Sequence, residues 1–394
     1  MQKDALKQKV KESIDQLIAL RRSIHQFPEL GLDCNRTASL VTDQLRNFGF
    51  EVQTGIAKTG VVGILRGPNE GPVTALRVDM DALPLQEQTG LPFASKVPNV
   101  MHACGHDGHT AIGLGVAKVL GSLRESLAGT VKIIFQPGEE SPGGAKIMIE
   151  EGVLTDPPVE SLLGCHIHPS LSSGTVGVCS GTVTAGNCDF QITVRGSGGH
   201  GARPYECKDP ITAAGNLIVA MQTIVSRRAD PLEPIVVSLG EISGGSGFNV
   251  IPEEVRLKGI IRYISAQTRE VALRGLKDIL AGIQSSFGVE TVFQTGEEDP
   301  PMQVNDELSS FIEEAATELL GTEKVCHINQ PSMGSEDFAF FTELIPCGYI
   351  RFGCFDKEKG YTYDLHNPHF DFDEKILSLG TETLTFLILK LLTR

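Results

Sequence analysis

The sequence lacks the features that mark nucleic-acid-binding, membrane and exported proteins. It has no run of lysine and arginine, and its formal net charge is −15, which argues against a basic surface for nucleic acid. The stretch FLILKLL near the C-terminus is far shorter than the roughly 20 apolar residues that cross a bilayer. Residues 1–27 are charged throughout and lack the apolar segment of a signal peptide. We therefore expect no nucleic-acid partner and no membrane partner.

The cysteines do not suggest a disulfide framework. There are nine of them, an odd number, scattered without close regular spacings. Such cysteines are typical of free, buried thiols, so we expect a protein of the reducing cytoplasm. The apolar fraction of 41% and the charged fraction of 21% are those of a soluble globular protein. A chain of 394 residues suits two domains, or one domain with a large insertion.

Two patterns of secondary structure divide the chain. Short strands apolar on both faces alternate with helical patterns in the first part, as at 61–67, 73–80, 130–136 and 161–167. This alternation is typical of a mostly parallel sheet covered by helices. From 185 to 296 the order becomes strand, helix, strand, strand, helix, strand, that of a ferredoxin-like unit. We predict an α/β domain of residues 1–184 and 297–394, interrupted by a ferredoxin-like domain at 185–296.

The stretch MHACGHDGHT, residues 101–110, concentrates possible metal ligands. Cys104 and His106 are separated by one residue, so both side chains can face a common point. A thiolate and imidazole combined with carboxylates suit a borderline divalent ion such as Zn²⁺, Co²⁺, Ni²⁺ or Mn²⁺. We expect His102 and His109 to support such a site, or to be solvated, rather than to bind metal.

Two stretches that follow or end apolar strands supply further polar groups. QPGEES places Glu139 and Glu140 after a buried strand, and such a pair can divide the work between metal binding and proton transfer. GCHIHP offers His166 and His168, of which we expect one to be a ligand, because Pro169 suggests that the strand has ended. In an open α/β sheet, polar stretches at the carboxyl ends of the strands can converge in one crevice.

Other histidines and loops leave the composition of the site open. Either His366 or His369, in LHNPHFDFDE, could close it from the other end of the domain. In the inserted domain, His200 in GSGGHGARP and Asn249 in GGSGFNVIP lie in glycine-rich loops that either present a polar group to a ligand or are ordinary hairpin loops. A thiol hydrolase using Cys104 is disfavoured, because catalytic Cys–His pairs usually come from separate segments.

Eight motifs along the chain resemble, in order, those of metallopeptidase family M20. They look most like its amidohydrolase branch, subfamily D, which includes hippurate hydrolases, N-acyl-amino-acid amidohydrolases and plant auxin-conjugate hydrolases. The resemblance covers essentially the whole chain and specifies the family more closely than the substrate. The motifs are RVDMDALP, MHACGHDGHT, FQPGEE, CHIHP, GSGGHGARP, GFNVIP, MGSEDFAFF and LHNPHFDF.

The resemblance implies roles for individual residues. Glu139 matches the general base that activates water. His200 matches a histidine of a lid domain that reaches the active site of the neighbouring subunit of a dimer and stabilises the oxyanion. Asn249 matches a lid asparagine near the substrate, and Arg262 lies near a position linked to the substrate carboxylate. The positions that hold a pair of divalent metals match Cys104, His106, Glu140, His166 and His366.

One position departs from the wider family. Many members carry a metal-ligating histidine where this chain has Asp79, two residues before Asp81. In the amidohydrolase branch, which this chain resembles, the Cys104 thiolate enters the metal set instead. We expect Asp81 to hold a ligand in orientation rather than to bind metal.

The activity implied by the resemblance is metal-dependent hydrolysis of small N-acyl amino acids to a carboxylic acid and a free amino acid. The two divalent ions would be Zn, Mn, Co or Ni, and the protein a homodimer formed through the inserted lid and dimerisation domain. Closely related alternatives are an N-acetyl-diaminopimelate deacetylase, a dipeptidase and a carboxypeptidase. A non-catalytic metal-binding relative is the alternative from another class, although the set of Glu139, Glu140 and the other candidate ligands argues against it.

Overall fold

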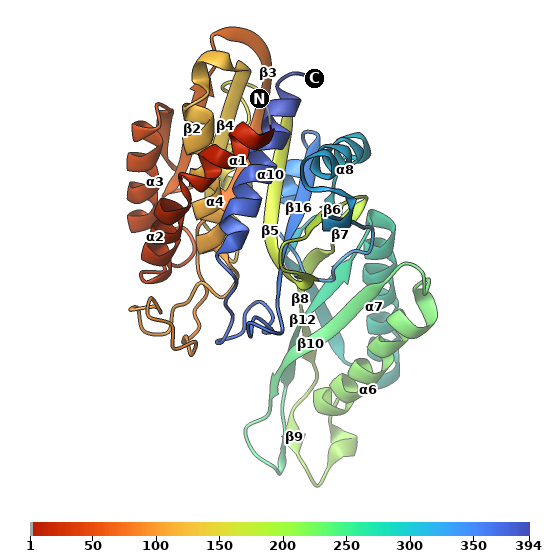
Figure 1. Ribbon diagram of the computed structural model, residues 1–394. Helices are drawn as coiled ribbons and strands as arrows, with labels where there is room; N and C mark the ends of the chain where they lie inside the picture. Colours follow the sequence, from red (N-terminus) through yellow and green to blue (C-terminus); the bar gives the residue numbers. More distant parts are fainter. Residues whose placement is uncertain (1–2) are drawn as a thin grey trace. The chain divides into compact units, whose positions relative to one another are not determined.

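The computed structural model describes residues 3–394, which form two compact units (Figure 1). The larger unit runs to Gly181 and resumes at Gln303–Asn329 and Phe340–Arg394, and the smaller comprises Thr182–Met302 and Gln330–Ala339. The segment 330–339 joins the smaller unit through Ser332, whose N–H donates to Val183 O (2.9 Å) and whose carbonyl accepts from Ala185 N–H (2.8 Å). The domain boundaries predicted from the sequence fall after residues 184 and 296, and they assign the segment 330–339 to the other domain.

The larger unit is built on an eight-stranded mixed sheet. The pairs β3–β4, β3–β5, β5–β16 and β6–β15 are parallel, so the predicted α/β class with a mostly parallel sheet is confirmed. The strand order is β1 (Glu51–Ile56), β2 (Gly60–Arg66), β4 (Ala128–Gln136), β3 (Asn69–Asp79), β5 (Ser161–Ser172), β16 (Cys347–Phe355), β6 (Val176–Cys179) and β15 (Val325–Ile328).

One detail of the predicted strands was wrong. β5 continues past Pro169 to Ser172 instead of ending before the proline. The pairing of β5 with β16 is irregular between Gly353 and Phe355, opposite this part of β5. Because proline cannot donate to a regular ladder, a strand tolerates it at such an irregularity.

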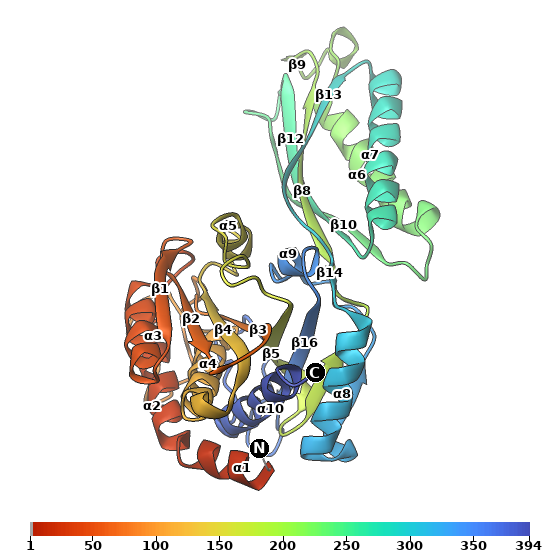
Figure 2. The same cartoon turned by 90° about the horizontal axis from the view of Figure 1, so that it is seen from above.

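Helices cover the sheet of the larger unit, and α4 and α10 lie side by side on one face (Figure 2). Small residues permit this close approach: a Cβ on Gly115 of α4 would lie 2.5 Å from Thr381 Oγ1 of α10. The helices are α1 (Lys3–Lys11), α2 (Ile14–His25), α3 (Asn35–Asn47), α4 (His106–Gly121), α5 (Gly144–Glu150), α8 (Asp306–Leu320) and α10 (Lys375–Leu391). Among residues 3–394, no helix has both the length and the apolar character needed to cross a membrane.

The smaller unit has its own sheet and its own apolar core. Its sheet is antiparallel, in the order β10-β12-β8-β13, and the core lies between this sheet and two helices. Asp209 caps the first helix by accepting from Ile211 N–H (2.9 Å). The elements follow as β8 (Gly186–Arg195), α6 (Pro210–Thr223), β10 (Ile235–Gly244), β12 (Glu254–Tyr263), α7 (Ala266–Phe287) and β13 (Glu290–Asp299).

The remaining elements are short. A two-stranded ribbon of the smaller unit pairs β9 (Gly199–His200) with β11 (Val250–Ile251). The others are β7 (Thr182–Thr184), β14 (Met302–Gln303), α9 (Ala339–Thr342) and the single turns η1 (Arg124–Ser126), η2 (Pro204–Glu206), η3 (Ile224–Arg228) and η4 (Thr322–Lys324).

Candidate metal centre

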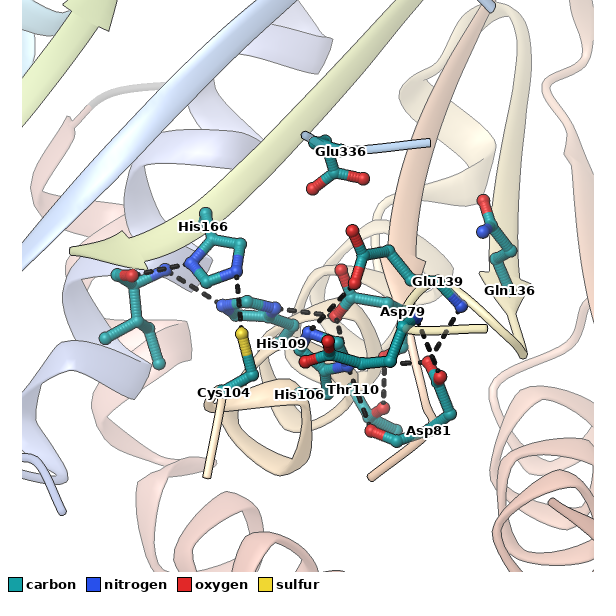
Figure 3. A network of polar contacts seen from close by, with 12 residues as sticks. Asp79, Asp81, Cys104, His106, His109, Thr110, Gln136, Glu139, His166 and Glu336 are labelled. Carbon is teal, nitrogen blue, oxygen red and sulfur yellow. Dashed lines mark hydrogen bonds and ion pairs between the residues drawn. The ribbon is translucent and has the colours of Figure 1, made fainter. Parts of the chain in front are cut away.

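Polar side chains gather where strands of the larger unit end (Figure 3). In the sheet, β3 lies between β4 and β5. Asp81 follows β3, Glu139 follows β4, His166 lies on β5, and His106 begins α4. Strand order therefore brings together stretches that are far apart in the sequence, at the edge where open α/β sheets bind ligands.

Cys104, His106 and His166 form a first set of potential ligands. Their ligand atoms lie within 4.8 Å of one another, and Cys104 Sγ is 3.5 Å from His166 Nε2. His106 Nδ1 bonds to the Asp81 carbonyl (2.9 Å) and His166 Nδ1 to the Ile167 carbonyl (2.6 Å). Each bond places a hydrogen on Nδ1, so in the neutral form of each ring Nε2 is the acceptor. His106 Nε2 is buried and has no hydrogen-bond partner among residues 3–394, as expected of an atom placed to bind a cation.

A second set shares the thiol with the first. Ligand atoms of Cys104, Glu140 and His366 lie within 4.8 Å of one another, and His366 Nε2 is 3.2 Å from Glu140 Oε1. The His366 N–H donates to the Ala103 carbonyl (2.8 Å), and its φ of 62° is uncommon for a residue other than glycine. A third set, of His106, Glu139 and Glu140, overlaps both. The three overlapping sets together supply enough donor atoms for more than one divalent ion.

Asp81 holds the loop that carries the two glutamates. Its Oδ1 accepts from the N–H of Glu139 (3.1 Å) and its Oδ2 from the N–H of Glu140 (3.0 Å). Both carboxylate oxygens are thus committed to backbone donors, and Asp81 is fully buried. Asp81 therefore fixes the backbone positions of both glutamates.

Asp79 and His109 form a buried pair beside the first set of ligands. His109 Nδ1 bonds to Asp79 Oδ1 (2.6 Å), and the Ile167 N–H donates to His109 Nε2 (2.9 Å). The other Asp79 oxygen accepts from Arg77 (2.7 Å). Both His109 nitrogens are therefore occupied, and the ring supports the backbone next to His166. Sequence reasoning left the role of Asp79 open, and no motif indicated its pairing with His109.

The protonation of the site favours a bound cation. Burial, together with the charges of Glu140 and Glu139, raises the pKa of Cys104 well above its ordinary value. Burial opposes a charged His106, yet Asp79 and Asp81 raise its pKa to about 10. A negative potential that would protonate His106 also attracts a divalent ion, and such an ion would stabilise the Cys104 thiolate. Without a cation the thiol stays protonated, which disfavours Cys104 as a free nucleophile.

Three other histidines singled out from the sequence lie outside these sets. Both nitrogens of His102 are buried without a hydrogen-bond partner among residues 3–394, and burial lowers its pKa to about 3. His168 bonds through Nδ1 to Ser170 (2.7 Å). His369 bonds through Nδ1 to the Gln88 carbonyl (2.9 Å). The sequence left open the choice between His166 and His168 and between His366 and His369. His166 and His366 belong to the ligand sets, whereas His168 and His369 do not.

A buried ionic network anchors the start of α4. Asp107 Oδ2 accepts from Arg21 (2.7 Å) and lies 2.8 Å from His25 Nδ1. Although burial favours the neutral acid, Arg21 and His25 hold the pKa of Asp107 well below its usual range. The network fixes the residue next to His106. Arg21 and His25 are four residues apart on α2, so helical spacing could have revealed their common face.

The three residues predicted in the inserted domain all lie in the smaller unit. His200 is exposed on β9, where its Nδ1 accepts from Ala202 N–H (3.2 Å), which leaves the hydrogen on Nε2. Asn249 is also exposed, and its carbonyl accepts from Gly201 N–H (2.8 Å). Arg262 on β12 has a buried Nη1 without a hydrogen-bond partner in the described part of the chain.

Mixed sulfur, nitrogen and oxygen donors at the carboxyl edge of an α/β sheet, with a second glutamate beside them, are typical of metal-dependent hydrolases. Residues 75–390 match Peptidase family M20/M25/M40. The chain belongs to this family and is a hydrolase.

Curated relatives and solved structures agree with this assignment. The chain is 42% identical to "Hippurate hydrolase" of Campylobacter jejuni, covering 95% of this chain and 96% of that protein. It is 40% identical to "IAA-amino acid hydrolase ILR1-like 4" of Arabidopsis thaliana, covering 93% and 83%. The crystal structure of Bacillus subtilis YXEP, described as a dinuclear metal binding peptidase from the M20 family, superposes with a TM-score of 0.85 at 34% identity, covering 97% and 99%.

Proposed function

We propose that this protein is a di-metal amidohydrolase that cleaves small N-acyl amino acids to a carboxylic acid and a free amino acid. The proposal rests on the overlapping ligand sets around Cys104 and on His106 Nε2, which is buried and has no hydrogen-bond partner in the described part of the chain. The names of two relatives, a hippurate hydrolase and an IAA-amino acid hydrolase, support the substrate class. The metals would be held by Cys104, His106, Glu140, His166 and His366, and the mixed donors suit Zn, Mn, Co or Ni.

The residues of the larger unit divide the reaction between them. When bound, a pair of divalent ions polarises the scissile carbonyl and acidifies water. Glu139, whose Oε2 lies 3.9 Å from His106 Nε2, takes a proton from the attacking water. It then returns this proton to the nitrogen of the leaving amino acid as the C–N bond breaks. The Asp81 carboxylate holds Glu139 in place by accepting a hydrogen bond from the backbone N–H of Glu139.

The smaller unit serves, in this proposal, as a ferredoxin-like lid and dimerisation domain. The hydrogen on His200 Nε2 can be donated to an oxyanion in the active site of the partner subunit. Asn249 contacts the substrate, and the buried Nη1 of Arg262 receives its carboxylate. Exposed apolar side chains support burial against a second copy: Tyr205, Val219, Leu232, Ile242 and Phe248.

The surroundings of the cysteines support a reducing location. None of the nine takes part in a disulfide among residues 3–394, and seven of them are buried, so the fold does not depend on oxidised cysteines. We include the cytoplasm in the proposal on this ground.

Metal removal and reconstitution test the proposal. Protein stripped by a chelator should lose hydrolysis of N-acyl amino acids, and added Zn²⁺, Mn²⁺, Co²⁺ or Ni²⁺ should restore it with about two ions per chain. A panel of N-acyl amino acids, dipeptides and N-acetyl-diaminopimelate, read by mass spectrometry, separates the amidohydrolase from its closest alternatives. Amidase activity that persists in metal-free protein would show that the metal is not required.

A further inference from the structure

A cavity adjoins the candidate metal centre within the larger unit. Its volume is about 600 Å³, which falls in the range of roughly 300–1,000 Å³ found for small-molecule sites. Glu140, a proposed metal ligand, forms part of its wall. Most of the other lining side chains are apolar: Leu30, Leu32, Ala82, Leu83, Pro84 and Pro142.

Hydrogen bonds fix the walls of this cavity to one another. The Ala82 N–H donates to the Glu29 carbonyl (2.8 Å), next to Leu30. Leu83 exchanges two backbone hydrogen bonds with Met101, each of 3.0 Å. The Asp81 carboxylate, directly before Ala82, holds the N–H of Glu140 (3.0 Å). The cavity is therefore formed in advance of any ligand.

The charges around the cavity favour a neutral occupant. Lys58 is the only cation among the lining residues, and its Nζ lies 2.6 Å from Asp33 Oδ1. Glu140 adds a negative charge to the lining. A substrate carboxylate would meet two acids and a cation that is already paired, whereas an uncharged apolar group would be dehydrated favourably.

We propose that this cavity is the acyl site, which receives an aliphatic or aromatic acyl group longer than acetyl. The inference rests on the proposed function, because Glu140 as a metal ligand places the cavity next to the scissile amide. The carboxylate of the amino acid lies outside the cavity. Leu30 and Leu83 then determine which acyl groups are accepted.

A charge placed in the cavity tests the assignment. Leu30 is 39% exposed, so Leu30→Lys should fold, and Leu30→Ser makes the same test without a charge. Leu344, which is 57% exposed and does not line the cavity, provides the matched control Leu344→Lys. The metal-loaded proteins are compared on N-acetylglycine, N-hexanoylglycine and N-acetylleucine by kcat/KM.

Leu30→Lys should lower kcat/KM for N-hexanoylglycine by roughly tenfold or more, while both N-acetyl substrates change by less than about threefold. Leu344→Lys should leave all three unchanged. An equal loss on all substrates, no loss on any, or a loss confined to N-acetylleucine would overturn the acyl assignment. The last result would place the amino-acid side chain in the cavity instead.

Failure of the proposed function is distinguishable from failure of the acyl site. If the metal-loaded wild type hydrolyses none of the three substrates, the proposed function is wrong. Equilibrium dialysis with N-hexanoylglycine then decides on the cavity: binding that Leu30→Lys weakens and Leu344→Lys does not supports the acyl site. Absence of binding, or equal binding by all variants, overturns it.

Discussion

Two histidines, His106 in the larger unit and His200 in the smaller, lie in opposite surroundings. His106 is fully buried, its Nδ1 fixed by the Asp81 carbonyl at 2.9 Å. His200 is exposed on a two-stranded ribbon, where backbone pairing and a hydrogen bond from Ala202 N–H hold it. The larger unit thus holds its candidate ligands in a buried network, whereas the smaller presents His200 to solvent.

The largest effect in the larger unit should come from neutralising Glu139, the proposed general base. Glu139→Gln should lower kcat by roughly 10²–10⁴-fold, the range of general acid–base catalysis, because the amide cannot take a proton from water. Steady-state kinetics and metal analysis should show lost turnover with the metal content retained. Glu150→Gln, at an exposed position on α5, is the matched control. Near-normal turnover of Glu139→Gln would remove Glu139 from the role of base.

The buried network around Asp107 should make the larger unit sensitive to acid. Asp107→Asn should cost about 3–5 kcal/mol of unfolding free energy at neutral pH, because it leaves Arg21 buried without this partner. The pKa of Asp107 is depressed in the folded state, so its contribution is complete above the unfolded pKa of about 3.9 and is lost as the pH falls toward the folded pKa. Urea unfolding followed by circular dichroism should show the difference between variant and wild type narrowing below about pH 4. A difference independent of pH would contradict this assignment.

His200 tests the dependence of the smaller unit on a partner. His200→Ala should lower kcat by roughly 10²–10³-fold through the loss of an oxyanion donor, with little effect on stability because the side chain is exposed. A mixture of Glu139→Gln and His200→Ala proteins should regain activity, since a mixed dimer contains one intact site. Mass spectrometry of the mixture establishes subunit exchange. Exchange without regained activity would count against the arrangement across subunits.

The smallest of these effects should come from the residue that holds the glutamate loop. In Asp81→Asn, one carboxylate oxygen becomes an NH₂ group that cannot accept a backbone N–H, so one of the two bonds to Glu139 and Glu140 is lost. Metal affinity or activity should fall by about 10–100-fold, as for other residues that orient ligands. Competition with a chelator measures the metal affinity. Unchanged affinity and turnover would show that the loop holds its shape without Asp81.

Much of the larger unit could be predicted from the sequence because its signals are local. Apolar runs indicated the strands at 73–80 and 130–136, and the spacing of Cys104 and His106 indicated that their side chains can face a common point. The contacts that join distant segments carry no local signal. The pairing of Asp79 with His109 and the choice of His166 over His168 depend on strand register and ring orientation, which sequence spacing does not determine.

The smaller unit includes a segment that periodicity does not predict, residues 330–339. The order of its strands and helices follows from periodicity, but the return of residues 330–339 depends on two backbone hydrogen bonds at Ser332. Backbone bonds of this kind are available to any residue except proline. The amino-acid composition of residues 330–339 therefore does not predict that they contact the smaller unit.

Asp81 lies next to both the glutamate loop and the proposed acyl cavity, and this bears on how the enzyme can acquire new substrates. Its carboxylate fixes the loop that carries Glu139 and Glu140, while the chain directly after it forms a wall of the proposed acyl cavity. Side chains at Leu30 and Leu83 can be exchanged without altering the groups that bond to Asp81. New acyl preferences can arise there by single substitutions, and a library confined to these two positions is a rational starting point for engineering the enzyme toward chosen amides.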